Sequence, residues 1–358
     1  MKKSLIALAV LGSVAGVAQA QSTVTLYGLA DVWVGSTKAT VTSGGVSTSA
    51  RTTRVDGAGF NTSRFGLKGS EDLGGGLKAN FQLEQGYNSD TGTVGATGFA
   101  FNRQAWVGLS GGFGEVQVGR VWTSYDDIRS SANDTFNANI ASSFSTWIGY
   151  NDRTNNGIKY LTPSFGGISG SVTYALGEDK NTSTNGKDNN LLSVGVQYAG
   201  GPVFVGFAHQ TEKSGTTTKL GAAGTLGGLI PDGTKVAYNL LNGSYDLGVV
   251  KLLAGFNQAK ATEPATPGFL KASEFFFGVE APLSSALSVA GGVSQSKIKD
   301  DTGPQLKGTG FSIAAKYALS KRTFTYAALT QTKFKDNTGA TSDSAKSQLL
   351  AVGVNHSF

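Results

Sequence analysis

The sequence predicts an all-β fold, a 16-stranded antiparallel transmembrane β-barrel with short periplasmic turns, long extracellular loops and the third loop folded into the lumen. Three observations predict it: an export signal, a terminal strand that ends on an aromatic residue, and connections that alternate between short and long. A membrane barrel needs such strands, because each one presents an apolar face to lipid and a smaller or polar face to the lumen.

The N-terminus has the pattern of an export signal. Two lysines precede an apolar run over residues 5–18, and Ala18-Gln19-Ala20 provides the small residues of a signal-peptidase site. We therefore expect a signal peptide over 1–20 and one barrel domain over 21–358. The apolar run is shorter than the ~20 residues of a membrane-spanning helix, and no later segment approaches that length. If the mature chain spans a membrane, it must do so as a closed barrel.

The composition excludes several other classes. Charged residues make up 15% of the chain against a usual ~25%, and the mean hydropathy is −0.09, which suits strands with one apolar and one wet face. The absence of cysteine excludes a disulfide framework, thiol chemistry and a cysteine-based metal site. The net charge is +6, or +4 without the two signal-peptide lysines, and it is spread without a basic block, so a nucleic-acid partner is not expected.

Strand-like runs of roughly ten residues recur, bounded by Gly, Pro, Asn and Asp. They lie at about 23–35, 60–71, 76–88, 101–110, 113–121, 157–162, 167–176, 190–199, 202–211, 236–245, 249–258, 272–281, 285–297, 308–319, 322–333 and 347–358. Tight turns alternate with long polar loops at about 36–59, 89–100, 122–156, 177–189, 212–235, 259–271, 298–307 and 334–346. A β-sandwich with Greek-key connections has no reason to keep this order, so we expect both termini on the short-turn, periplasmic side.

The residues of individual strands alternate as lipid and lumen faces require. In the terminal strand the apolar face carries Leu350, Val352, Val354 and Phe358, and the other carries Ala351, Gly353, Asn355 and Ser357. In the 76–88 strand the apolar face carries Leu77, Ala79, Phe81 and Leu83, and the polar face carries Lys78, Asn80, Gln82 and Glu84.

The 122–156 loop is the longest and mixes aromatic residues with acids. Its members are Trp122, Tyr125, Asp126, Asp127, Asp134, Phe136, Phe144, Trp147 and Tyr150. Such a cluster would promote association if it were exposed to solvent. We therefore expect this loop to fold into the barrel and pack on its wall.

Several segments resemble a known family. They are Thr25-Leu-Tyr-Gly, Ser63-Arg-Phe-Gly-Leu-Lys-Gly-Ser-Glu-Asp-Leu-Gly, Phe81-Gln-Leu-Glu, Asn102-Arg-Gln-Ala-Trp-Val-Gly-Leu, Phe113-Gly-Glu-Val-Gln-Val-Gly-Arg and Val352-Gly-Val-Asn-His-Ser-Phe. Together they resemble the general trimeric porins of Gram-negative outer membranes, closest to the β-proteobacterial branch. The likeness covers the mature chain and is densest over 23–176.

The resemblance implies a pore constriction between wall arginines and acids of the third loop. The arginines would be Arg64, Arg103 and Arg153, with Glu84 as a lumen carboxylate beside them. The loop acid that faces the pore would come from Asp126, Asp127 and Asp134, although the Pro-Glu-Phe-Gly-Gly motif of enterobacterial relatives is absent. Lys68, Lys78 and Asp31 are additional lumen candidates.

Facing guanidiniums stay charged and focus a positive potential between low-dielectric walls, which favours anions. We therefore expect an anion-leaning general diffusion porin, a homotrimer of the outer membrane that contacts its lipids and lipopolysaccharide and passes ions and small hydrophilic solutes. We expect no enzyme activity, cofactor or metal, because His209 and His356 are the only histidines and no Gly-x-Ser-x-Gly motif is present.

Two alternatives stay open. A substrate-specific porin would line its lumen with a ladder of aromatic residues, and Trp33, with Asp31 on the same strand face, is the nearest candidate. An adhesin, receptor or hydrolase that uses the barrel only as a scaffold would have a closed lumen and no conductance.

Overall fold

The computed structural model describes residues 23–94, 100–142, 149–177, 190–213, 234–262, 269–299, 305–336 and 343–358. The expected signal peptide lies outside the described residues. No helix in the described part of the chain is long and apolar enough to cross a membrane.

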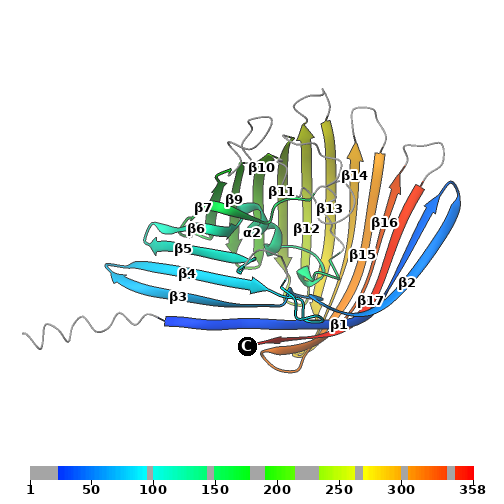
Figure 1. Ribbon diagram of the computed structural model, residues 1–358, viewed down its shortest axis with the longest axis horizontal. Helices are drawn as coiled ribbons and strands as arrows, with labels where there is room; N and C mark the ends of the chain where they lie inside the picture. The colour runs from blue at the N-terminus through cyan, green and yellow to red at the C-terminus, as the bar shows by residue number, and fades with distance from the viewer. Residues whose placement is uncertain are drawn as a thin grey trace, which may run out of the picture.

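Seventeen antiparallel strands form one sheet in the described residues (Figure 1). Their bounds are β1 Thr23–Ser43, β2 Val46–Gly57, β3 Arg64–Gly74, β4 Leu77–Gly86, β5 Gln104–Gly111, β6 Gly114–Trp122, β7 Arg153–Leu161, β8 Ile168–Ala175, β9 Leu191–Gly200, β10 Val203–Lys213, β11 Lys235–Asp246, β12 Lys251–Thr262, β13 Phe269–Pro282, β14 Leu287–Lys299, β15 Gln305–Ala318, β16 Thr323–Asp336 and β17 Asp343–Ser357. All sixteen predicted strands are present, with ends shifted by a few residues except in β1, which continues well past its predicted end.

The sheet closes on itself at β1. One edge of β1 pairs with β17, and the other pairs with β3 along its first seven residues, Thr23 to Leu29. The Phe358 N–H donates to the Gly28 carbonyl at 3.0 Å, and the Gly28 N–H donates to the Phe358 carbonyl at 3.2 Å. The chain therefore forms the predicted closed 16-stranded barrel of β1 and β3–β17, with both described ends at the short-turn rim.

The prediction of a loop over 36–59 is wrong. β1 continues to Ser43, and β2 pairs with its upper part, from Val32↔Gly57 to Ser43↔Val46. Gly44 and Gly45 join the two strands with φ of +57° and +83°, the left-handed conformation that a two-residue hairpin turn requires. The Thr- and Val-rich stretch favours strands despite its polarity, because β-branched side chains pack well on a pleated surface.

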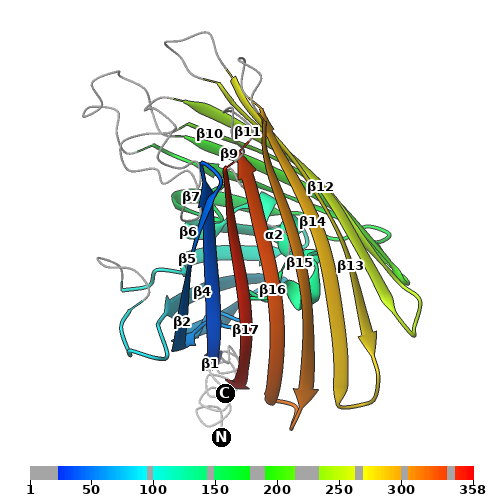
Figure 2. The same ribbon diagram turned by 90° about the vertical axis from the view of Figure 1, so that its right-hand side faces the viewer.

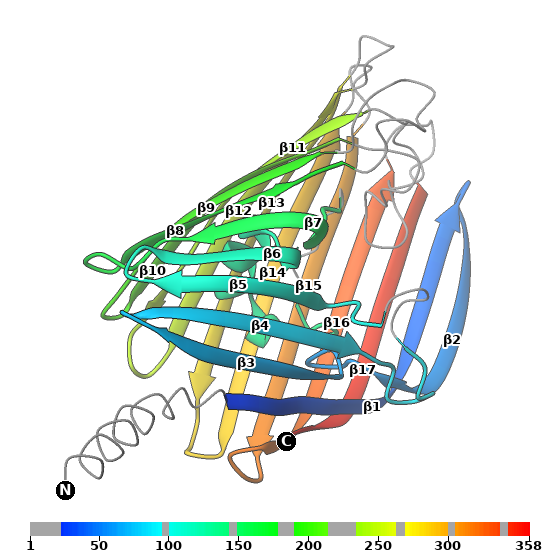
Figure 3. The ribbon, with the colours of Figure 1, turned by 60° about the vertical axis from the view of Figure 1, so that its left-hand side comes forward.

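The barrel wall is uneven in height. Strands β3–β9 have 8 to 11 residues, whereas β11–β17 have 12 to 15. Figure 3 shows the short strands β3–β7 beside β1, and Figure 2 shows the tall wall of β12–β17. The predicted faces are confirmed, since outward side chains such as Phe65 and Val194 are 44% and 38% exposed, while the inward Ser193 is buried.

The third loop, between β6 and β7, lies inside the barrel. It contains α2 (Ser124–Ser131) and the 3-10 helix η1 (Thr135–Asn137). α2 contacts β8–β11, and η1 contacts β13–β15 (Figures 1 and 2). Phe144 and Trp147 of this loop lie outside the described residues.

Hydrogen bonds and close packing hold α2 against the barrel wall. Tyr125 is fully buried, and its hydroxyl donates to Asn257 Oδ1 at 2.7 Å. The Asn242 amide donates to the Ile128 carbonyl at 2.8 Å, near the C-terminal end of the helix. Gly206 admits the helix, because a Cβ atom there would lie 2.6 Å from Ile128 Cγ2. The helix is therefore a fixed part of the lumen.

A second part of the third loop, together with the segment before β3, covers the inner face of β15–β17 and β1. Phe60 packs there with Ala138 and Ala141 of the third loop, next to Tyr326. The backbone of Ile140 donates to the Gly59 carbonyl at 3.0 Å, which joins this part of the third loop to the segment before β3.

Asp31 and Trp33 lie beneath this cover, which corrects two expectations. Asp31 was expected to face the lumen, but its carboxylate is fully buried and accepts hydrogen bonds from three backbone N–H groups, of Gly59, Phe60 and Asn61. The side chains of Tyr326 and Asn355 also donate to it. Trp33 is 3% exposed and donates to the Gly57 carbonyl, so it presents no aromatic surface to a passing solute.

Candidate functional site

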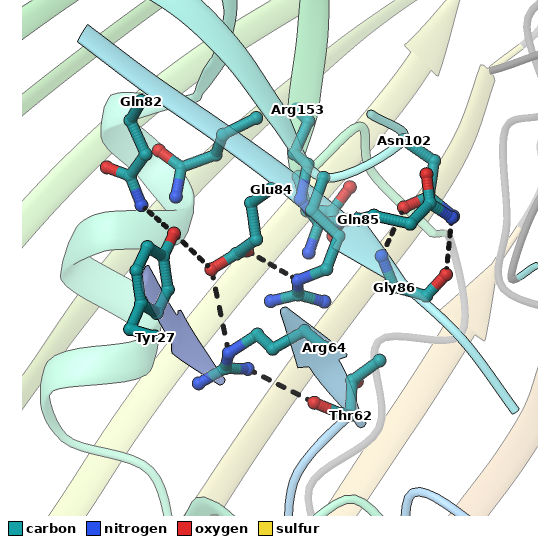
Figure 4. A network of polar contacts seen from close by, with 12 residues as sticks. Tyr27, Thr62, Arg64, Gln82, Glu84, Gln85, Gly86, Asn102 and Arg153 are labelled. Atoms are coloured by element: carbon teal, nitrogen blue, oxygen red, sulfur yellow. Dashed lines mark hydrogen bonds and ion pairs between the residues drawn. The ribbon is translucent and has the colours of Figure 1, made fainter. Parts of the chain in front are cut away.

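The short wall of the barrel gathers two arginines around one carboxylate. Glu84 lies on β4, Arg64 begins β3 and Arg103 immediately precedes β5. Arg103 Nε lies 2.6 Å from Glu84 Oε1, and Arg64 Nε lies 3.6 Å from Glu84 Oε2. Figure 4 shows how Arg64 and Glu84 approach each other. The sequence prediction that these three residues would be neighbours is therefore met in the structure.

Tyr27 of β1 completes this cluster. Its hydroxyl donates to Glu84 Oε2 at 3.0 Å and accepts from Gln82 Nε2 at 2.6 Å (Figure 4). The Glu84 side chain is only 5% exposed, so its contacts fix its orientation toward the two guanidiniums. One negative charge therefore faces two positive charges, which leaves a local positive excess.

Arg153, at the start of β7, adds a third guanidinium. Its Cζ lies 3.6 Å from the centre of the Trp122 ring, and Arg103 Cζ lies 5.4 Å from the same ring. Arg153 also pairs with Asp152 at 2.8 Å. The electron-rich face of Trp122 attracts cations, so this indole positions two of the three arginines. The sequence placed Trp122 in the third loop but gave no signal of this role.

Arg120 is a further wall arginine that the sequence reasoning did not select. Its Nε donates to the Asn102 carbonyl at 2.7 Å, and its Nη1 donates to Asn155 Oδ1 at 2.5 Å. Arg120 therefore links Asn102, which lies just before β5, to Asn155 near the start of β7. A single Arg at the end of a strand carries no spacing signal, so only the fold reveals this link.

Asp126 and Asp127 lie in the first turn of α2. The Tyr150 hydroxyl donates to Asp126 Oδ1 at 2.5 Å, and burial raises the pKa of Asp126 to about 6. Asp127 accepts from Lys159 of β7 at 2.5 Å. Burial raises the pKa of Asp127 and the Lys159 ammonium opposes that rise. The Asp127 side chain is 36% exposed, so it is in contact with lumen water.

Asp134 lies apart from Asp126 and Asp127. Of the three acids predicted to face the pore, only those two remain candidates. Asp134 is fully buried and accepts from Ser142 Oγ at 2.6 Å. Its side chain packs on β13 and β14, where a Cβ atom on Gly292 would lie 1.9 Å from Asp134 Oδ2. The backbone path of the third loop, rather than its composition, places this acid away from the arginines.

Lys68 and Lys78 share the inward face of their strands with Arg64 and Glu84, as predicted. Both are exposed, and Lys68 Nζ lies 5.3 Å from the centre of the Tyr27 ring. They extend the basic character of the short wall toward the periplasmic turns.

The two histidines lie away from any such cluster. His209 Nδ1 is 2.8 Å from Asn239 Oδ1, and His356 Nδ1 is 2.9 Å from Thr323 Oγ1. Both side chains are on the outward face of the barrel, the face that Phe207 and Val354 share on the same strands. Among the described residues, no group of three or more His, Cys, Asp or Glu side chains could hold a metal ion.

Comparison with known proteins gives one consistent result. A family model described as "Gram-negative porin" matches residues 7–337. The chain is 35% identical to outer membrane porin protein 32 of Delftia acidovorans, with 91% of this chain and 88% of that protein covered. It is 31% identical to an outer membrane porin protein of Bordetella pertussis, with both chains covered in full.

Solved structures agree with the fold. An anion-selective porin from Comamonas acidovorans superposes with a TM-score of 0.75 and 29% identity, covering 94% of this chain and 100% of that chain. An outer membrane protein of Vibrio cholerae, solved in a trimer form, gives a TM-score of 0.68 at 15% identity and covers 94% and 99% of the two chains.

The closed barrel, the internal third loop and the charged lumen define a channel-forming protein of the outer membrane. The chain belongs to the Gram-negative porin family. It is accordingly a multi-pass β-barrel of the Gram-negative outer membrane.

Proposed function

We propose that this porin is a general diffusion channel that passes ions and small hydrophilic solutes passively and prefers anions. The observation that carries the preference is the cluster of Arg64 and Arg103 on the single carboxylate of Glu84, with Arg153 beside it. Arginine is not deprotonated in proteins, and a charged cleft with low-dielectric walls concentrates counter-ions. The anion-selective relative supports the same proposal.

In this proposal, the constriction lies between the arginines of the short wall and α2. Asp127 is its acidic member, because its side chain is 36% exposed. Fixed positive and negative groups on opposite sides of a narrow pore produce a transverse field, which orients dipolar solutes and disfavours apolar ones. Lys68 and Lys78 extend the field toward the periplasm. Asp134 and Asp31 are excluded from this constriction by their burial.

The test is the reversal potential of purified, refolded protein in a planar bilayer under a salt gradient. We expect anion preference that weakens in Arg64→Gln and in Arg153→Gln, because each change removes one fixed positive charge. At ~4 Å and an effective dielectric of ~20, a unit charge pair is worth about 4 kcal/mol, so the change is measurable. Arg322→Gln, an exposed arginine in a periplasmic turn, is the matched control. A cation-selective wild type would refute the anion preference.

Further parts of the proposal concern processing and assembly. We propose that residues 1–20 are removed on export, that three copies assemble, and that the outer surface contacts outer-membrane lipids and lipopolysaccharide. We also propose that the protein has no enzyme activity of its own. A folded, inserted protein without conductance would favour the scaffold alternative over the channel.

A further inference from the structure

One buried acid on the inner face of the barrel wall has no part in the site described above. Glu212 is the next-to-last residue of β10 and is only 2% exposed. Its two carboxylate oxygens accept hydrogen bonds from the backbone and side-chain N–H groups of Asn151, at 2.8 and 2.7 Å, and from Gln210 Nε2, at 2.6 Å. Within the part of the chain that the structure describes, no lysine or arginine pairs with it. The carboxylate therefore serves to hold the segment that contains Asn151.

The held segment lies at the end of the third loop, where Asn151 precedes Arg153 by two residues. The Asn151 carbonyl accepts from Gln210 Nε2 at 3.0 Å, and the Gly149 carbonyl accepts from the hydroxyl of Tyr238 on β11. β8 and β9 lie between β7 and β10 in the sheet, so these bonds join parts of the wall that are not neighbours. Side chains of β10 and β11 therefore fix the point from which the chain enters β7.

Both sides of the proposed constriction connect to this segment. Asp152, the next residue, pairs with Arg153 at 2.8 Å, and its carbonyl accepts from the Thr123 N–H at 2.9 Å. Thr123 is the N-cap of α2, the helix that bears Asp127. A displacement of Asn151 would therefore move the Arg153 guanidinium and the first turn of α2 together.

We propose that Glu212 is a positioning residue of the pore, which holds Asn151 and thereby keeps Arg153 in the place where its charge favours anions. Because Glu212 is buried, it acts through Arg153 and not by contact with a permeating ion. This inference rests on the proposed anion preference, and it adds a residue outside the constriction on which that preference depends.

The hydrogen bonds of Glu212 allow its position and its charge to be tested separately. An ionised carboxylate only accepts hydrogen bonds, and all three of its partners here are donors. Glutamine keeps these contacts when the Asn151 amide turns over, because the amide oxygen then accepts from the new NH₂ group. Alanine keeps none of them and leaves the buried donors without an acceptor, which is costly. Glutamine thus removes the charge alone, whereas alanine removes the charge and the hold on Asn151.

The test measures the ratio of anion to cation permeability from reversal potentials of the refolded protein in a planar bilayer. Glu212→Ala removes a negative charge, which by electrostatics alone would raise the preference for anions. We expect the opposite result, a fall in the ratio at least half as large as that in Arg153→Gln, because Arg153 loses its fixed position. Glu212→Gln removes the same charge and keeps the contacts, so its ratio should equal or exceed that of the wild type.

Glu280→Ala is the matched control. Glu280, on β13, is another wall acid that accepts a backbone N–H of the third loop, from Phe136 at 2.9 Å. Its removal should not lower the permeability ratio, and an equal fall there would overturn the assignment to Glu212. Folding of every variant is checked by heat-modified mobility on gels. If Glu212→Ala does not fold, Asn151→Ala replaces it, because this change removes one of the bonds to Glu212 and should lower the ratio to a smaller extent.

Hydrogen exchange of the Asn151 backbone amide gives a readout that does not depend on ion preference. The amide donates to Glu212, so we expect it to exchange at least about tenfold faster in Glu212→Ala and at the wild-type rate in Glu212→Gln.

The two measurements separate failure of this inference from failure of the proposed channel function. Unchanged exchange in Glu212→Ala would overturn the inference, as would faster exchange without a fall in the permeability ratio. A fall in Glu212→Gln as large as that in Glu212→Ala would also overturn it. A wild type that prefers cations would overturn the proposed anion preference instead, while faster exchange in Glu212→Ala would still show that Glu212 holds Asn151.

Discussion

At the scale of single residues, the charged side chains on the inner face differ in whether other segments of the chain cover them. Arg64, Arg103 and Glu84 were predicted together from the resemblance to the porin family, and the strand period places Arg64 and Glu84 on the inward face. Asp31 and Asp134 also occur in suitable positions, but segments that are distant in sequence cover them. A periodicity argument identifies a face, and it carries no information on which loop later packs against that face.

The raised pKa of Asp126 leads to a prediction for stability. A carboxyl whose folded pKa is about 6, above its ordinary 3.8, binds more protons in the folded than in the unfolded protein between those two values. Stability from this group is therefore present at low pH and is lost as the pH rises from about 4 to about 6. We expect Asp126→Asn to become stabilising relative to the wild type across that range, by at most about 3 kcal/mol.

Thermal midpoints of both proteins from pH 4 to pH 7 measure this effect. The Tyr150 hydroxyl can donate to either the carboxylate or the amide oxygen, so the substitution keeps that contact. A midpoint difference that is the same at every pH would contradict the assignment of this pKa to Asp126.

At the scale of elements, glycines on the inner barrel wall contribute as much to the position of the third loop as its side-chain contacts do. The aromatic residues of the loop predicted that it would pack inside, but its path follows from inward glycines on the wall. At Gly206, a Cβ atom would meet Ile128 of α2 at 2.6 Å. Glycine is common throughout this sequence, so composition could not mark the few positions that admit the helix.

We expect Gly206→Ala to move α2 off the wall and lower the stability of the folded barrel by about 1–3 kcal/mol, because overpacking forces neighbours to shift. The single-channel conductance should change with it, since α2 bears the acid side of the proposed constriction. Gly112→Ala is the control, because a Cβ atom there meets nothing within 4 Å. Equal conductance and melting behaviour in both variants would show that α2 does not depend on this close approach.

At the scale of the whole molecule, the sixteen barrel strands and their order were predictable, because the strands repeat the same simple alternation and most turns carry glycine, proline or aspartate. The gathering of lysines on the outward face of β10–β17 was not, since these residues are scattered through the sequence and come together only when the register is known. A net charge of +4 over the mature chain gave the impression of a diffuse distribution. The barrel concentrates much of that charge on one wall.

Closure of the barrel at the β1–β17 seam depends on the last residue. The Phe358 ring packs over Gly28, where a Cβ atom would lie 2.5 Å from its Cζ atom. We expect Phe358→Ala to reduce refolding yield and to destabilise the folded barrel by about 1–2 kcal/mol, the burial energy of a half-exposed aromatic ring. Phe311→Ala, which removes an outward ring of similar exposure away from the seam, should leave the refolding yield unchanged. The yields are compared by heat-modified mobility on gels.

The unequal height of the wall has a consequence for how a solute meets the charges. Arg64 and Arg153 are the first residues of their strands, so they stand at the upper margin of the short side, whereas β1 continues for another fourteen residues past the level at which Leu29 pairs with Arg64. At physiological salt a charge acts over about 8 Å. Under the proposed anion preference, these guanidiniums therefore act on a permeating ion near the upper margin of the short side. In that proposal, the charges that sort ions lie at the level where the short strands end and the tall wall continues alone.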